Sequence, residues 1–309
     1  QQGRVKEALR AYKKALNDDP DSADIHRKMG RAHFDDGEYD KAVSELKKVL
    51  DMEGDDPKTL AMLGRSYAAK RDWGKSMEAY ERALEMDEED ARIRVEFANA
   101  LLKLNYSKRA VKEMKLATEL APNKAEAWVG LGTMNFRQGK LADAEANFNK
   151  AVELAPDYPD SYVGLAQIYG ARKDSASQIK NLKKALAIDS KNAEAHMELG
   201  LALYTEKKGR DAIKRLQRAL DLDPDLAKAA YYLGFAYFNQ RQEGNALEAF
   251  EQAASIDPDY AEAHYQLGQI YEKQGKKDQA IAAYQAAVKA KSDYTDAVLA
   301  LKKIAPDAS

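Results

Sequence analysis

Small and large apolar side chains recur along this chain with a period of 34 residues. In residues 125–158, Leu131 and Gly132 stand at places seven and eight, Ala144 at place twenty and Phe148 at place twenty-four. At about 100° per residue, places four, seven, eight and eleven share one side of a helix, and places twenty and twenty-four share one side of the next. The pattern therefore predicts two amphipathic helices in each period, joined by a short turn.

The same pattern continues in both directions without an insertion. The twentieth place is almost always small, and its occupants are Ala42, Ser76, Ala110, Ala144, Gln178, Ala212, Ala246 and Ala280. Because each repeat of such an array packs only on its neighbours, the length of the chain sets no domain count, and we expect one continuous array. The predicted complete repeats are 23–56, 57–90, 91–124, 125–158, 159–192, 193–226, 227–260 and 261–294.

Two part-repeats flank this array. Residues 1–22 match the second helix of a truncated repeat, with Ala8 at its twentieth place and Pro20 near its end, and no partner helix precedes it. We therefore expect a longer protein whose repeats continue upstream. Residues 295–309 are predicted to form a C-terminal capping helix and a tail, because Lys302 places a charge where no later helix has to approach.

The pattern resembles the tetratricopeptide repeat (TPR) family, whose unit has a large residue at place four, Leu-Gly at seven and eight, Ala at twenty, an aromatic residue at twenty-four and Pro at thirty-two. The resemblance spans essentially the whole chain. It implies an all-α, right-handed superhelical solenoid of 34-residue helix-turn-helix repeats. One departure, Gln178 at a place that is normally small, is expected to affect the local helix spacing. Pro is missing at place thirty-two in four repeats, at Gly54, Glu88, Ser190 and Ser292.

Composition and charge narrow the class of partner. The 49 basic and 51 acidic residues are interspersed and leave a net charge of -2, so no nucleic-acid partner is expected. No apolar run is long enough to span a bilayer and no signal peptide is visible, which predicts no membrane insertion and a soluble, cytoplasmic protein. A signal upstream of residue 1 would not be seen. The absence of cysteine excludes disulfides and thiol chemistry.

Candidate catalytic and metal-binding chemistry is sparse. Three of the four histidines share the fourth place of the repeat with Trp128, and a metal site would need clustered ligands, so we interpret them as structural. They are His26, His196 and His264. Lys75 lies in a short phosphate-loop-like sequence, but the first glycine is replaced by Ala69 and the stretch lies between two helices. We predict no catalytic residue, no metal, no cofactor and no enzymatic activity.

Places two, five, six, nine, twelve and thirteen lie opposite the core side of the first helix, and in the TPR family this side lines the concave groove where ligands bind. In residues 193–294 many of these places are apolar or aromatic, and a contiguous apolar patch on a surface usually marks an interaction site. The predicted partner-binding residues are Met197, Leu201, Tyr231, Tyr232, Phe235 and Tyr265. Aromatic residues at place twelve, such as Phe238, are instead expected to be half-buried between neighbouring helices.

A secondary basic groove is predicted near the N-terminal end, and its residues are Arg27, Lys28, Arg31 and Arg65. Such a groove suits an acidic segment of a partner. The alternative interpretation is that these basic residues are solvated charges that bind no ligand.

The sequence favours a non-enzymatic protein–protein interaction scaffold that binds a peptide or helix of a partner protein in its concave groove. One alternative is a targeting or assembly arm of a larger enzyme or multiprotein machine, such as a pilus or secretion apparatus. Another is a scaffold that self-associates through the open N-terminal end of the stack. The Lys–Asn pair at places five and nine that holds chaperone tails in TPR proteins occurs in none of the repeats, so that binding mode is not expected.

Overall fold

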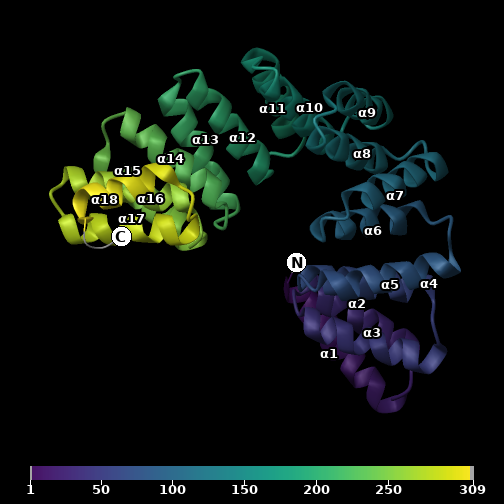
Figure 1. Cartoon of the computed structure of the whole chain (residues 1–309). Coiled ribbons are helices and arrows are strands. Elements are labelled where there is room, and N and C mark those ends of the chain that lie inside the picture. Colours follow the sequence, from purple (N-terminus) through teal and green to yellow (C-terminus); the bar gives the residue numbers. More distant parts are fainter. Residues whose placement is uncertain (1, 307–309) are drawn as a thin grey trace. The chain divides into compact units, whose positions relative to one another are not determined.

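The protein is described by a computed structural model that covers residues 2–306, and within these residues every regular element is a helix (Figure 1). The predicted all-α class is therefore confirmed. The helices are α1 (Gln2–Asp18), α2 (Ala23–Asp35), α3 (Tyr39–Glu53), α4 (Pro57–Ala69), α5 (Trp73–Met86), α6 (Ala91–Lys103), α7 (Ser107–Leu120), α8 (Ala125–Arg137), α9 (Leu141–Leu154), α10 (Pro159–Ala171), α11 (Ser175–Ile188), α12 (Ala193–Thr205), α13 (Gly209–Leu222), α14 (Ala227–Asn239), α15 (Glu243–Ile256), α16 (Ala261–Lys273), α17 (Lys277–Ala290) and α18 (Thr295–Ile304).

The helices form two compact units, Gln1–Pro156 with α1 to α9 and Asp157–Ser309 with α10 to α18. Within each unit every helix packs on the next one along the chain. The most extensive contacts join the two helices of one predicted repeat, as in α2 with α3 and α12 with α13. Some first helices of neighbouring repeats also touch, as α2 touches α4 and α12 touches α14. The division into eight complete repeats with flanking part-repeats stays a sequence-based prediction, and residues 307–309 of the predicted tail lie outside the described residues.

The small eighth place has a direct steric cause. A Cβ atom built on Gly132 would lie 2.9 Å from the ring of Phe148, and one built on Gly234 would lie 2.7 Å from the ring of Phe250. Both rings are almost completely buried. Glycine on the first helix therefore makes room for the large residue at place twenty-four of the second helix.

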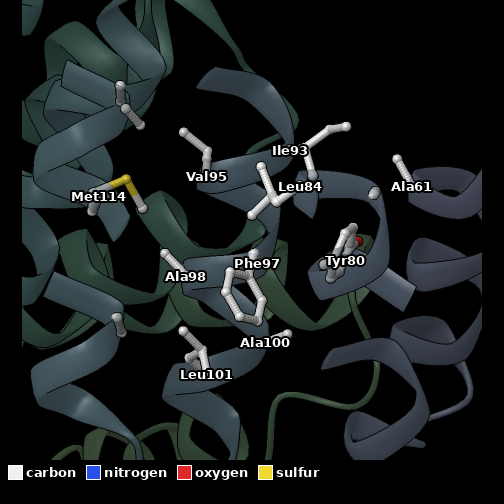
Figure 2. Close-up of a cluster of buried hydrophobic side chains, with 14 of the residues drawn as sticks. Ala61, Tyr80, Leu84, Ile93, Val95, Phe97, Ala98, Ala100, Leu101 and Met114 are labelled. Atoms are coloured by element: carbon white, nitrogen blue, oxygen red, sulfur yellow. The ribbon is translucent and has the colours of Figure 1, made fainter. Parts of the chain in front are cut away.

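The first unit shows how successive repeats share their core. Figure 2 shows Tyr80 of α5, Phe97 of α6 and Met114 of α7 in one buried cluster. The rings of Tyr80 and Phe97 are 6.4 Å apart and tilted, a favourable arrangement for aromatic pairs. Within each unit, a second helix thus packs against the first helix of the next repeat, which is why a single repeat cannot bury its own apolar surface.

The turn between the two helices of a repeat has one fixed backbone conformation. Its fifteenth place is left-handed in all eight predicted repeats, at Gly37, Arg71, Asn105, Gly139, Lys173, Lys207, Arg241 and Gly275. Glycine adopts this conformation without strain, whereas the other side chains are held there by the packing of the helices on either side. The glycines that indicate turns in the sequence therefore mark a position that the fold requires even where another residue occupies it.

Gln178 departs from the small residue expected at place twenty, and the structure shows how it is accommodated. A Cβ atom built on Gly170 of the facing helix α10 would lie 2.8 Å from the Gln178 amide nitrogen. The missing side chain at Gly170 therefore provides the space that Gln178 takes up on α11.

In the part of the chain that the structure describes, none of the helices combines the length and the apolar character needed to cross a bilayer.

Candidate functional site

The fourth place of the repeat holds a side-chain donor that fixes the preceding turn. In four repeats a ring N–H donates to the backbone carbonyl six residues earlier: His26 to Pro20 (3.2 Å), Trp128 to Pro122 (2.9 Å), His196 to Ser190 (3.2 Å) and His264 to Pro258 (3.0 Å). Arg94 uses its guanidinium in the same way, at 2.9 Å from the Glu88 carbonyl oxygen. The three histidines therefore stabilise the connection between repeats, as the sequence analysis interprets them.

A second contact in two of these repeats comes from a carboxylate at place twenty-three. His26 Nδ1 lies 2.5 Å from Glu45, and an Arg94 nitrogen lies 2.5 Å from Glu113. Burial raises the pKa of the Glu45 carboxyl, but hydrogen bonds from His26 and Lys48 outweigh it and lower that pKa below its usual value. Both ring nitrogens of His26 therefore lie within hydrogen-bond distance of an acceptor. The remaining histidine, His33, lies 2.6 Å from Glu38.

No site for a metal ion is formed by the described residues. Across residues 2–306, histidine, aspartate and glutamate side chains never gather in a group of three or more that could hold an ion.

The predicted basic groove is a real concavity in the first unit. Its volume is about 610 Å³, and it lies along α2 and α4. Its lining residues are Arg27, Lys28, Arg31, Phe34, Asp35, Leu46, Lys58, Thr59, Ala61, Met62, Arg65 and Arg92. All four basic residues of the sequence prediction are among them, and Lys58 and Arg92 add two more cations.

Acidic neighbours neutralise part of this groove. Both oxygens of the Glu96 carboxylate lie 2.8 Å from Arg65 Nε, and the hydrogen bonds that Arg65 donates to Glu96 raise the pKa of that guanidinium. Arg27 pairs with Glu53, and Lys28 lies 2.6 Å from Asp24. These acidic partners are not predicted from the sequence, although Glu96 stands at place six of the next repeat, which is also on the groove side of the first helix.

Two cations of the groove remain available. Among the described residues, no carboxylate pairs with the side chain of Arg31 or Lys58, and both are exposed. The half-buried side chains of Phe34 and Met62 supply apolar surface in the same groove. The groove therefore offers two free positive charges beside an apolar wall.

The predicted aromatic patch lies in the second unit, and its aromatic rings form two separate groups. Tyr231 and Phe235 of α14 are 5.0 Å apart between ring centroids, and Tyr231 lies 5.3 Å from Tyr232. Tyr204 of α12 joins them, at 6.3 Å from Tyr232. Tyr265 belongs to a different ring group, with Tyr284 and Tyr294 at 5.8 and 5.2 Å. We call Tyr204, Tyr231, Tyr232 and Phe235 the aromatic cluster.

Several residues of this prediction are less accessible than the place numbering suggests. Met197 at place five is 6% exposed, and Leu201 is half-buried. Place five is also buried at Ala61, Val95 and Val163. Phe238 at place twelve differs in the other direction, since it is 42% exposed where half-burial is expected.

The aromatic cluster also has a packing role. The rings of Tyr231 and Phe235 lie 5.8 and 5.2 Å from the buried ring of Phe250. Burial raises the pKa of the Tyr231 hydroxyl, and it raises that of neighbouring Tyr260 to about 12. The ring of Tyr232, by contrast, is paired with Tyr204 and Tyr231, which are themselves half-buried.

We expect this difference to separate packing from surface function. Tyr231→Ala should lower the free energy of unfolding by roughly 1–3 kcal/mol, because it leaves space over Phe250. Tyr232→Ala should lower it by less than about 1 kcal/mol. Urea denaturation of both variants measures this. Equal losses would show that the two rings have the same packing role, and Tyr232→Ala would then lose its value as a surface variant.

Models of one family match nearly the whole chain. Six tetratricopeptide repeat models match residues 1–66, 59–92, 95–159, 159–192, 210–240 with 244–275, and 261–302. The chain belongs to the tetratricopeptide repeat family. TPR proteins are in general non-catalytic scaffolds for protein interaction, which is the coarse function that membership supports. A search of curated protein sequences gave no significant match.

Solved structures of similar fold include other TPR proteins. The chain is 17% identical to a chain of the APC/C hetero-tetramer Cut9–Hcn1, with a TM-score of 0.72 over 96% of this chain and 59% of that one. It is 19% identical to the human IFIT1 dimer with m7Gppp-AAAA, with a TM-score of 0.72 over 98% of this chain and 77% of that one. Pseudomonas aeruginosa PilF is 22% identical, with a TM-score of 0.56 over 59% of this chain and 83% of that one. At these identities the likeness shows the TPR fold alone.

Proposed function

We propose that this TPR chain is a non-enzymatic protein-interaction scaffold that binds an acidic segment of a partner protein in the groove along α2 and α4. The observation that carries the proposal is the pair of unpaired cations, Arg31 and Lys58, beside the apolar wall of Phe34 and Met62. An extended acidic peptide with one or two apolar side chains matches both features.

The aromatic cluster and the residues predicted with it form a second proposed contact surface. Tyr232 and Phe235 carry half-exposed rings, and aromatic residues often contribute most to binding at interfaces. Met197 is buried and Tyr265 lies against Tyr284 rather than in the aromatic cluster, so the proposed contact surface rests mainly on Tyr232 and Phe235.

Two broader hypotheses are compatible with this proposal. A targeting or assembly arm of a larger enzyme or machine would use the same grooves, and PilF provides a TPR precedent of similar fold. Self-association would use the exposed side of α1, and a dimer in light scattering would identify it. A cytoplasmic location, with neither nucleic acid nor membrane as partner, is part of the proposal.

Selection of binding peptides tests the proposed groove. A random peptide library displayed on phage should yield acidic sequences, whose binding weakens as salt is added. Arg31→Glu should weaken the selected peptide about tenfold, because it replaces an attractive charge by a repulsive one. Arg10→Glu, the same charge change on exposed Arg10 of α1 outside the groove, is the matched control. Selected peptides without acidic residues, or equal weakening by both variants, would contradict the proposal.

A further inference from the structure

A carboxylate at place twenty-three faces the donor at place four in two repeats, and in a third repeat a cation stands at place twenty-three. His26 faces Glu45 and Arg94 faces Glu113, so each of these donors meets a carboxylate from the second helix. In the repeat of His196 the equivalent position on α13 is Arg215. His196 Nδ1 is buried and has no hydrogen-bond partner, and the residue as a whole is 5% exposed. A cation thus stands where the other two repeats supply an anion.

The second helix of this repeat presents further positive charge. Lys214, Arg215 and Arg218 of α13 line a groove of about 550 Å³ together with His196 and the turn residue Ser190. Arg218 lies 4.0 Å from Asp221, a contact at the limit of an ion pair. Within residues 2–306, no carboxylate pairs with Lys214 or Arg215. Apart from His196 of α12, this groove is lined by second helices and a turn, whereas the surfaces described above are built mainly by first helices.

We propose that this groove is a binding site for an oxyanion, a carboxylate or a phosphate group, held by Lys214, Arg215 and Arg218 and hydrogen-bonded by His196 Nδ1. The anion accepts a hydrogen bond from the residue at place four, as the carboxylates of Glu45 and Glu113 do in two other repeats. His196 Nε2 already donates to the Ser190 carbonyl, so Nδ1 can donate only when the ring is protonated. The arriving anion supplies the acceptor that makes protonation favourable.

The charges around His196 explain why the site needs an external anion. Burial, together with the charges of Arg215 and Arg218, lowers the pKa of His196, while the hydrogen bond to Ser190 and the charge of Asp189 oppose this. The ring is therefore neutral without a ligand near neutral pH. Since Nδ1 has almost no exposed surface, side chains that line the groove must move for an anion to reach it.

Titration with simple anions, read by NMR, tests the site. The chain has four histidines, so the His196 ring signals can be assigned and followed while sulfate or acetate replaces chloride at constant ionic strength. We expect saturable shifts of the His196 signals and a rise of its pKa. Sulfate keeps its charge between about pH 5 and 8, so its affinity should increase as the pH falls through the pKa of His196. The stronger of the two anions identifies whether the site suits a phosphate-like or a carboxylate group.

Variants decide whether the groove is responsible. Arg215→Glu supplies the missing carboxylate within the chain, as in the repeats of His26 and Arg94, and should weaken sulfate binding about tenfold or more. Arg215→Gln removes only the charge and should have a smaller effect, which keeps the test valid if the first variant folds poorly. Arg210→Glu makes the same charge change on an exposed residue of α13 outside the groove. His196 signals that do not move with either anion, or that move equally in Arg215→Glu and Arg210→Glu, would overturn the proposal.

Discussion

Phe148→Ala should lower the free energy of unfolding of the first unit by about 3–5 kcal/mol. The Phe148 ring is fully buried, and it fills the space that Gly132 leaves on the facing helix. Truncation removes the apolar contacts of the ring and leaves a cavity, because the backbone of α8 cannot move in without breaking its packing on α7.

Urea denaturation and hydrogen exchange measure this effect together. Because repeats stabilise each other only through their neighbours, protection should fall first in α8 and α9. Phe148→Leu keeps most of the volume and is the control, with an expected loss well below that of alanine. A loss under about 1 kcal/mol for Phe148→Ala would mean that place twenty-four does not anchor the repeat.

Arg94→Ala should have a comparably large effect, about 3–5 kcal/mol, for an electrostatic reason. The side chains of Arg94 and Glu113 are only 13% and 10% exposed and lie 2.5 Å apart. Removal of the arginine leaves a buried carboxylate without a partner, and the Glu88 carbonyl loses its donors.

A double-mutant cycle separates the pair from its parts. Arg94→Met combined with Glu113→Met should recover most of the lost stability, because no unpaired charge remains. The more exposed pair of Arg109 and Glu81, at 2.7 Å with side chains 48% and 33% exposed, is the matched control, and its loss should cost less than about 1 kcal/mol. If both pairs give equally small effects, the contact between places four and twenty-three is incidental to the fold.

The repeat itself could be predicted from the sequence because each of its places has one steric requirement. Gly132 and Phe148 belong together wherever the two helices cross, so their spacing alone indicates a helix pair. The left-handed conformation at place fifteen could be predicted only where the residue is glycine, since Arg71 and Lys173 adopt it without any sequence signal.

The candidate surfaces were harder to predict, because they depend on pairs of side chains from different repeats. The place numbering located Arg27 and Arg65 in the groove but not their partners Glu53 and Glu96. The place numbering also predicted Met197 to be on the solvent-exposed side of its helix, whereas the side chain is buried in the structure. Helix periodicity describes one helix at a time, so contacts between repeats follow only from the structure.

The central claim, that the groove along α2 and α4 receives an acidic segment, is tested most directly by mapping the bound peptide. Backbone amide NMR spectra of the protein, recorded with and without the selected acidic peptide, locate the contact. We predict that the largest changes fall on α2 and α4 around Arg31, Lys58 and Met62, and that Arg31→Glu removes them. Changes confined to other helices, with these residues unaffected at saturation, would contradict the account.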